Sequence, residues 1–369
     1  MILTVLFYSF VVFTAIQIVY YIVFSAFLFD NQKDKRRKKS IEIPISVIIC
    51  AKNEAENLQK FLPSIINQKY NDFEIVIIND ASSDKTLEVM KLFFFFYKNI
   101  KVINVENIEA FWGNKKYALT LGIKAAKNKH LLFTDADCKP ISENWISEMA
   151  QNFNQEKTII LGYGKYKKEK SLVNLFVRFE TLLTAIQYFS YAKLGSPYMA
   201  VGRNLAYHKD EFFNVKGFIN HMHIKSGDDD LFIQDAANKE NTVICTSAKS
   251  FTESLAPTSF AAWFRQKRRH ISTANHYKLK HKFFLGLFFV SKVFLFLLTI
   301  ILFFFYRWEI ILPIFLSYYL VQFFVIGFSS KKLKEPTITY FLPFLEIGLL
   351  LFQFSIFITN LWSKPNHWK

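Results

Sequence analysis

Two aspartates separated by one residue, Asp135 and Asp137, follow an apolar run at positions 131–134 of this 369-residue chain. Two carboxylates this close repel each other unless water or a cation screens them. Oxygen ligands in this arrangement suit a hard divalent cation, which typically binds one or two carboxylates together with the phosphates of a substrate. The pair therefore predicts a Mg²⁺ or Mn²⁺ site that binds a nucleoside diphosphate.

The two glycine motifs that commonly bind phosphate groups are absent from the sequence. No GxxxxGK[ST] segment occurs, and GYGKYK at 162–167 lacks the third glycine of the dinucleotide-binding fingerprint. We therefore expect the metal ion and basic side chains to hold the diphosphate.

Four short and mostly apolar runs lie at 46–50, 74–79, 101–105 and 131–134. Segments compatible with helices separate them. Runs without alternation indicate strands that are buried on both faces, and hence a parallel sheet. This order predicts a doubly wound, Rossmann-like open α/β sheet, which binds its ligands beyond the carboxyl ends of the strands.

Polar residues follow three of these strands and should share one crevice, because the carboxyl ends of parallel strands meet at one edge. They lie at 51–54, 80–84 and 135–137. Asn53 and Ser83 suit the N-caps of the helices that they precede, and we expect capping to be part of their role. Capping does not explain why Asp80 lies at the same edge as Asp135 and Asp137.

Four apolar stretches are long enough to cross a membrane as helices, since about 20 residues suffice. They occupy 2–29, 283–306, 310–328 and 338 to about 362. The first stretch is too long for a cleavable signal peptide, and it has neither a basic leader nor a small-residue cleavage site. The sequence therefore predicts four membrane spans.

Basic residues cluster beside these spans. Six lie between Lys33 and Lys39, seven lie between Arg265 and Lys282, and three precede the last span, within a net charge of +16. The positive-inside rule then predicts a multi-pass protein of the cytoplasmic membrane, with its soluble domain in the cytoplasm and its N-terminus outside. Basic clusters at these positions favour membrane lipids as partners, and they argue against nucleic acid.

The predicted organisation has six parts. They are an N-terminal transmembrane helix (1–30), a basic cytoplasmic linker (31–43), a catalytic domain (44–256), an interfacial amphipathic segment (257–282), three transmembrane helices (283–362) and a tail (363–369). The tail would lie outside, although its two lysines oppose that topology.

Two charged residues lie within the predicted spans. Lys292 lies nine residues into the second span and Glu346 lies eight residues into the fourth. Both are then about 12–14 Å deep, at about 1.5 Å per residue. Equal depth predicts a salt bridge, because unpaired charges inside a membrane are costly. The alternative is that both spans begin later and both side chains reach the membrane surface.

Four motifs, in this order, resemble the donor-binding half of the family 2 glycosyltransferases, which have the GT-A fold. They are SVIICAKNEAENL, IVIINDASSDKT, GNKKYALTLG and FTDADCKP. The resemblance implies a nucleotide-sugar donor, which we expect to be a UDP-sugar. It implies that the donor contacts Asn53, Glu54, Asp80, Lys115 and Asp135, with Asp137, beside Asp135, as the direct ligand of Mg²⁺ or Mn²⁺.

The second half of the domain continues this resemblance. LGSPYMAVGRNLAYHKDEFFNVKGF at 194–218 resembles the acceptor-binding segment, which implies that Arg203 and Asn204 contact the acceptor.

Three consecutive acids follow in SGDDDLFIQ at 226–234. The catalytic base of the family is the second acid of an acidic pair, which implies Asp229 with Asp228 beside it. Three consecutive acids contain two overlapping pairs, so Asp230 is the alternative base. A helix N-terminus that favours acids through its dipole would also explain the run.

The segment WFRQKRRH resembles the Q-x-x-R-W element of membrane polysaccharide synthases. Gln266 and Arg269 would share one face of an interfacial helix, and the arginine could bind the departing diphosphate. His270 replaces the tryptophan that contacts the acceptor sugar in those synthases, which argues against processive polymerisation. A basic face that binds lipid headgroups is the other interpretation, and the segment could do both.

The expected function is an inverting, metal-dependent glycosyltransferase that uses a lipid or lipid-linked saccharide as acceptor at the cytoplasmic face of the membrane. A processive polysaccharide synthase of the same fold is the alternative. A sugar nucleotidyltransferase would need a glycine-rich N-terminal loop that the sequence lacks. A non-catalytic membrane scaffold would have no reason to align Asp80, Asp135, Asp137 and Asp229.

Overall fold

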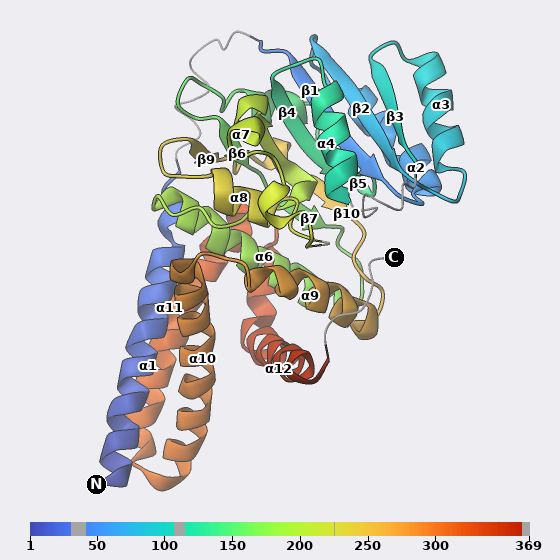
Figure 1. The fold of residues 1–369 in the computed structure, drawn as a ribbon. Coiled ribbons are helices and arrows are strands. Elements are labelled where there is room, and N and C mark those ends of the chain that lie inside the picture. The colour runs from blue at the N-terminus through green and yellow to red at the C-terminus, as the bar shows by residue number, and fades with distance from the viewer. Residues whose placement is uncertain (31–41, 107–114, 225, 364–369) are drawn as a thin grey trace.

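A computed structural model describes residues 1–30, 42–106, 115–224 and 226–363. An α/β domain lies above a bundle of long helices, and the N-terminus is at the far end of that bundle (Figure 1). The basic linker and the tail fall almost wholly outside the described residues.

The main sheet has seven strands in the order β3-β2-β1-β4-β8-β6-β9. Their bounds are β1 Ile45–Ala51, β2 Phe73–Asp80, β3 Ile100–Val105, β4 His130–Asp135, β6 Ile159–Leu161, β8 Leu205–His208 and β9 Thr242–Ile244. The first four are parallel, which confirms the predicted strands, while β8 is antiparallel to both β4 and β6. The result is a mixed GT-A-like sheet.

Helices cover both faces of the parallel strands. Their bounds are α2 Ala55–Ile66, α3 Thr86–Phe96, α4 Lys115–Ala125 and α5 Trp145–Ala150. On β1, Val47 and Ile49 pack with α2 and α3, whereas Ile48 packs with α4. Successive side chains of a strand point to opposite faces, so an unbroken apolar run is what a sheet covered on both sides requires.

The remaining elements extend this domain toward the bundle. A second, three-stranded sheet has the order β5-β10-β7, with bounds β5 Cys138–Pro140, β7 Gly164–Tyr166 and β10 Thr252–Ser254. The helices are α6 Leu172–Lys193, α7 Lys209–Asn214, α8 Asp230–Ala236 and α9 Phe260–Ala274, and the short 3-10 turns are η1 Ala26–Phe29, η4 Gly202–Asn204, η5 Ile219–His221, η6 Ala248–Ser250 and η7 Pro336–Phe341. Most of α6 is buried core, and α6 and α9 lie between the main sheet and the bundle (Figure 1).

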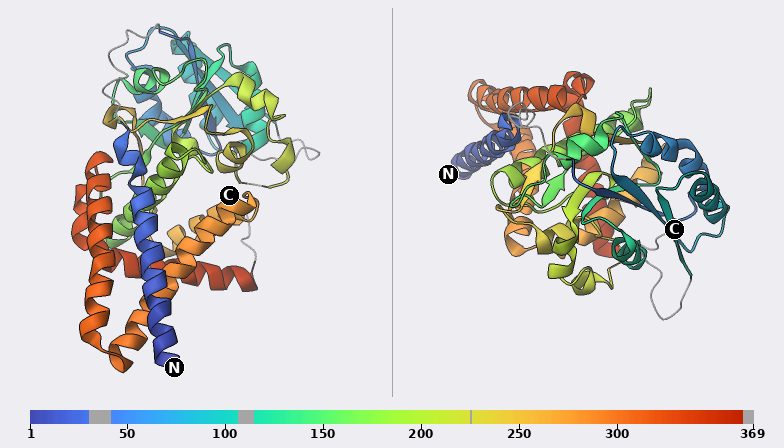
Figure 2. Two further views of the ribbon diagram at one scale, coloured as in Figure 1. Left: turned by 90° about the vertical axis from the view of Figure 1, so that its left-hand side faces the viewer. Right: turned by 90° about the horizontal axis from the view of Figure 1, so that it is seen from above.

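Four helices are long and apolar enough to cross a membrane when η1 and η7 are counted with their neighbours. They are α1 Ile2–Phe24, α10 Leu279–Phe305, α11 Trp308–Lys332 and α12 Leu342–Trp362. Helices α1, α10 and α11 pack along one another. In contrast, α12 runs across the direction of α1 and α11 beneath the α/β domain (Figure 2).

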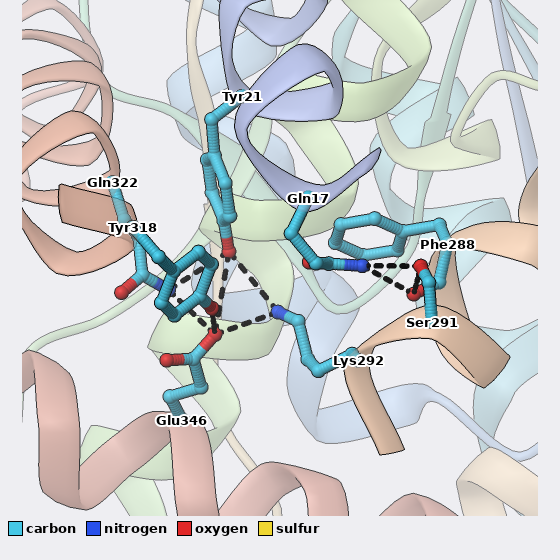
Figure 3. A network of polar contacts seen from close by, with 8 residues as sticks. All are labelled: Gln17, Tyr21, Phe288, Ser291, Lys292, Tyr318, Gln322 and Glu346. Carbon is cyan, nitrogen blue, oxygen red and sulfur yellow. Dashed lines mark hydrogen bonds and ion pairs between the residues drawn. The ribbon is translucent and has the colours of Figure 1, made fainter. Parts of the chain in front are cut away.

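The salt bridge predicted between Lys292 and Glu346 is present. Lys292 Nζ lies 2.7 Å from Glu346 Oε1, and both side chains are buried, so they bind each other and do not extend separately into solvent. Figure 3 shows that Tyr21 of α1 and Tyr318 and Gln322 of α11 point at the same carboxylate. One acid therefore joins all four long helices.

Candidate functional site

A cavity of about 600 Å³ opens at the carboxyl ends of β1, β2 and β4. These ends are level, because Ala51 pairs with Asn79 of β2 and Cys50 pairs with Asp135 of β4. The volume is that of a small-molecule site. The predicted site residues that line it are Glu54, Asp80, Lys115, Asp135, Asp137, Arg203, Asp228, Asp229, Asp230, Gln266, Arg269 and His270.

The loops after β1 and β2 hold each other in place. Asn53 Oδ1 accepts a hydrogen bond from the backbone N–H of Ser83, and the N–H of Asn53 donates to Ser82 Oγ. The N-caps of α2 and α3 are Glu54 and Lys85, so the expected capping role of Asn53 and Ser83 is wrong. Asn53 has a positive φ of 56°, a conformation that asparagine tolerates, and it links the loops instead of lining the cavity.

Two acids from this region, Glu54 and Asp80, line the cavity. Burial raises the pKa of the Asp80 carboxyl, although Lys52 and Lys115 oppose the shift. Burial also raises the pKa of Glu54, whose carboxylate accepts a hydrogen bond of 2.6 Å from Asn57. A polar ligand bound beside these two carboxyl groups would replace the hydrogen bonds with water that burial removes.

Lys115 connects the two halves of the cavity. Its Nζ lies 2.9 Å from Asp135 and 2.9 Å from Asp228. Burial favours the neutral amine, but the two carboxylates outweigh it and hold the pKa of Lys115 well above its ordinary value. The first residue of α4 is therefore a permanent cation between the predicted metal site and the predicted catalytic acids.

Asp135, Asp137 and Cys138 form a potential metal site, with ligand atoms that all lie within 4.8 Å of one another. Burial, followed by the charge of Asp135, raises the pKa of Asp137. Burial and the two aspartates keep the pKa of the Cys138 thiol well above its usual range, so this sulfur is a poor ligand. Two carboxylates that destabilise each other fit a hard cation such as Mg²⁺ or Mn²⁺.

The three consecutive acids have three different environments. Asp228 pairs with Lys115, which holds the pKa of this carboxyl below its usual value despite burial. Asp230 is buried and accepts hydrogen bonds from Tyr277 at 2.7 Å and from Thr273. The sequence left the roles of these acids open, and the side-chain directions separate them.

Asp229 lies between its two acidic neighbours. It accepts hydrogen bonds from the backbone N–H groups of Gly202 at 2.7 Å and of Asp230 at 2.8 Å, the second as N-cap of α8. Burial, then the charges of Asp228 and Asp230, raise the pKa of Asp229 to about 7. Capping thus accounts for part of the acidic run, while the raised pKa is typical of a functional carboxylate.

Helix α9 presents the predicted interfacial residues to the cavity. Gln266, Arg269 and His270 all line it, and the amide of Gln266 lies 3.4 Å from the hydroxyl of Tyr166. Residues three and four apart on a helix share a face, as the sequence pattern predicted. Thr273 of the same helix holds Asp230, so α9 is fixed to the acidic segment.

The two predicted acceptor residues from η4 point in different directions. Arg203 lines the cavity, where it donates to Ser254 Oγ at 2.9 Å and stacks over the Tyr166 ring. Asn204 is fully buried, and its amide is bonded to Trp145 and to the backbone carbonyls of Tyr163 and Ser250. The prediction that Asn204 contacts the acceptor is therefore wrong, because its side chain points into the core.

Lys116 was missed by the sequence analysis. It is buried behind Lys115, and its Nζ donates to the backbone carbonyls of His221 at 2.7 Å and Ile224 at 3.0 Å. Burial lowers the pKa of Lys116 to about 8. The second lysine of the GNKK segment thus holds the loop that leads to the acids, and only its adjacency to Lys115 hinted at this.

Family comparisons agree with this geometry. The model of Glycosyl transferase family 2 matches residues 46–210, and that of Glycosyl transferase family group 2 matches residues 130–326, more than half of the chain. The chain belongs to the family 2 glycosyltransferases. The first match includes the aspartate pair, and the second includes the three consecutive acids and α9.

Curated relatives of this family 2 glycosyltransferase align over limited segments. The 4,4'-diaponeurosporenoate glycosyltransferase of Staphylococcus haemolyticus is 31% identical over 140 residues, which is 36% of each chain. The poly-beta-1,6-N-acetyl-D-glucosamine synthase of Staphylococcus epidermidis is 37% identical over 95 residues, which is 25% of this chain and 21% of that one. The chain thus spans about a third or less of the length of these relatives.

A solved structure has the same fold along the whole chain. It is the mannosyltransferase PcManGT from Pyrobaculum calidifontis in complex with GDP-Man and Mn²⁺, with a TM-score of 0.60, 13% identity, and coverage of 99% of this chain and 100% of that one. Because the sequence identity is low, this likeness shows a shared fold and nothing more.

Proposed function

We propose that this glycosyltransferase transfers a sugar, with inversion, from a nucleoside diphosphate donor to a lipid or lipid-linked saccharide at the cytoplasmic face of the membrane. One observation carries the proposal. The cavity has acids and basic side chains where it meets the carboxyl ends of the strands, and Leu285 of α10 and Leu349, Phe352 and Ile356 of α12 line it where it meets the long helices.

The donor occupies the polar end. Asp137 and Asp135 would hold Mg²⁺ or Mn²⁺, which when bound would neutralise charge on the leaving diphosphate. Arg269 and Gln266 lie across the cavity on α9, where the guanidinium is suited to bind the diphosphate as it departs. Asp80 and Glu54 contact the nucleoside, and Lys115 pairs with Asp135 and orients its carboxylate.

Asp229 is the catalytic base in this proposal. Asp228 is neutralised by Lys115, and Asp230 is bonded to Tyr277 and Thr273, so Asp229 is the acid whose pKa lies near 7 in the cavity. A base with such a pKa accepts the proton of an acceptor hydroxyl efficiently at neutral pH. The new glycosidic bond forms as the bond to the diphosphate breaks, and a single displacement inverts the anomeric carbon.

The acceptor occupies the apolar end of the cavity, which lies next to the long apolar helices. The apolar side chains there exclude water. Arg203 and His270 line the same cavity and would bind the polar head of the acceptor. The similarity to a polysaccharide synthase favours one alternative, a processive synthase. The length of the saccharide product would distinguish the two functions.

Donor turnover by the purified full-length chain tests the proposal. Nucleotide sugars are first screened for thermal stabilisation with and without Mn²⁺, because a ligand that binds the folded state raises its melting temperature. Hydrolysis or transfer is then measured with the best donor, and Asp137→Asn should abolish it. Asp210→Asn changes an exposed aspartate remote from the cavity and serves as control. Neither binding nor turnover with any nucleotide sugar would refute the proposal.

A further inference from the structure

The segment formed by η7 and α12 is held to the α/β domain at both ends. Just before η7, Glu335 forms a buried salt bridge with Arg178 of α6. At the other end, Arg268 of α9 donates to Asn360 Oδ1 at 2.8 Å and to the backbone carbonyl of Ser363 at 2.6 Å. A helix of this length is about 32 Å long, so a perpendicular membrane span would place its second end far from α9.

The middle of α12 also packs on the α/β domain. The ring of Phe352 stacks on Trp263 of α9, with 3.8 Å between the centroids and an interplanar angle of 10°. Gly348 lies against Phe176 of α6 so closely that an added Cβ would lie 2.5 Å from the ring. The segment from Glu335 to Ser363 thus contacts the domain before α12 begins, in its middle and at its end. These contacts show that α12 runs along the domain, as Figure 2 also shows.

The two faces of α12 have different surroundings. Leu349, Phe352 and Ile356, at helical spacing, line the cavity. The opposite face is exposed and apolar, with the side chains Phe344, Ile347, Leu351, Phe354, Phe357 and Ile358. An exposed apolar surface of this extent needs a cover.

The position of α12 relative to the end of α1 indicates what covers this exposed apolar face. Glu346, in its second turn, contacts the hydroxyl of Tyr21, which lies three residues before the end of α1 at Phe24. About 20 residues cross the hydrocarbon core, so α1 leaves it near this position. The outer face of α12 therefore continues the lipid-exposed surface of α1, α10 and α11, and acyl chains are the cover that this continuity indicates.

We propose that α12 lies in the plane of the membrane, within the leaflet next to the catalytic domain, and does not cross it. It forms the lipid-facing wall of the acceptor end of the cavity, so the hydrocarbon of an acceptor can reach the site sideways between α10 and α12. Ser363 is then on the same side of the membrane as the catalytic domain, contrary to the topology that hydropathy predicted. The proposal rests on the membrane location proposed above, and it does not depend on which acid is the base.

Spin labels along the outer face measure the course of α12 in vesicles that contain the full chain. Single cysteines replace Ile347, Leu351, Phe354, Ile358 and Leu361, which extend over about 21 Å of helix. The accessibility of each label to oxygen and to a water-soluble nickel complex reports its depth. All five should lie at one depth, whereas labels at the exposed residues Val5, Val12 and Val19 of α1 should differ by about 10 Å per step. A depth that changes steadily along α12 would overturn the proposal.

The side of Ser363 gives a second measurement that needs no activity. In sealed vesicles, a membrane-impermeant maleimide should label Ser363→Cys from the same side as Lys98→Cys in the catalytic domain. Arg307→Cys, between α10 and α11, should label from the opposite side. Labelling of Ser363→Cys together with Arg307→Cys would refute the in-plane course. A chain with no turnover but with this labelling pattern would refute only the catalytic role.

Discussion

Asp229 differs from its two acidic neighbours in what its side chain contacts. Lys115 neutralises Asp228, and Tyr277 and Thr273 fix Asp230. Asp229 faces the cavity, and its hydrogen-bond partners among the described residues are backbone N–H groups. A charge that is already paired accepts a proton poorly, because protonation would break the pair. The three acids therefore differ in the groups that they contact, and single substitutions can test this difference.

Asp229→Asn should lower kcat by about 10²–10⁴, the usual contribution of a positioned base. Donor binding should change little, because the base contacts the acceptor. Asp230→Ala should instead lower the melting temperature, since the buried hydroxyl of Tyr277 loses its acceptor at a cost of about 1–3 kcal/mol. Initial rates and thermal unfolding of both variants separate the two roles. An Asp230→Ala variant that is stable but as inactive as Asp229→Asn would assign the base to Asp230.

The pH dependence of kcat/KM follows from the raised pKa of Asp229. A base must be deprotonated, so activity should rise with pH through about 7 and fall below it. Burial is the main cause of the raised pKa, and the charge of Asp228 adds to it. Asp228→Asn removes that charge and should move the acid limb of the profile to lower pH. An acid limb that stays in place in this variant would show that another group titrates.

At the scale of elements, α12 and α9 complete the cavity that the sheet begins. The ends of the strands supply acids, α9 supplies Gln266, Arg269 and His270, and α12 supplies apolar side chains. Gly348 permits this arrangement, because its lack of a side chain lets α12 approach Phe176 of α6. The close approach makes a small substitution informative.

Gly348→Ala should destabilise the protein and reduce transfer to the acceptor more than hydrolysis of the donor. Overpacking costs about 1–3 kcal/mol, which outweighs a gain of up to about 1 kcal/mol from helix propensity. Gly286→Ala on α10 is the matched control, because no atom of the described residues beyond its own stretch of helix lies within 4 Å of the added Cβ, and it should be neutral or stabilising. Thermal unfolding in detergent and the ratio of transfer to hydrolysis measure both effects. Equal behaviour of the two variants would contradict the close packing.

At the scale of the whole molecule, Glu346 joins the long helices to one another. Its carboxylate binds Lys292 of α10 and lies among hydroxyl and amide groups of α1 and α11 (Figure 3). Breaking a buried pair leaves an uncompensated charge and is strongly destabilising, by about 3–5 kcal/mol. The network therefore determines whether α12 stays at the level of the cavity.

Lys292→Glu should reduce the amount of folded protein in the membrane sharply, and adding Glu346→Lys should restore part of it. Recovery is expected to be partial, because the amide of Gln322, which now donates to Glu346, would face a second donor. Detergent-solubilised yield and monodispersity measure the effect for the two single variants and the double variant. A double variant that is no better than the worse single variant would contradict the importance of the pair.

Several features of this glycosyltransferase followed from the sequence alone. The apolar runs predicted the four parallel strands, because strands buried on both faces are mostly apolar; β1 and β4 fit this reason, whereas β3, at the edge of the sheet, exposes Lys101 and Asn104. The aspartates after β4 and the glutamate and aspartate after β1 and β2 were expected at one edge, and Glu54, Asp80, Asp135 and Asp137 all line the cavity. The Lys292–Glu346 pair was expected because an unpaired charge inside a membrane is costly, and the contact between the two side chains is present.

Only the tertiary structure decided the directions of individual side chains and the course of α12. Arg203 and Asn204 are neighbours, yet one faces the cavity and the other the core, because a 3-10 turn points them apart. Likewise, an apolar helix must be covered, but hydropathy does not distinguish lipid on every side from lipid on one side and protein on the other. Contacts with α6 and α9, remote in sequence, make that distinction for α12. Composition determines which surfaces avoid water, and long-range packing determines what they touch.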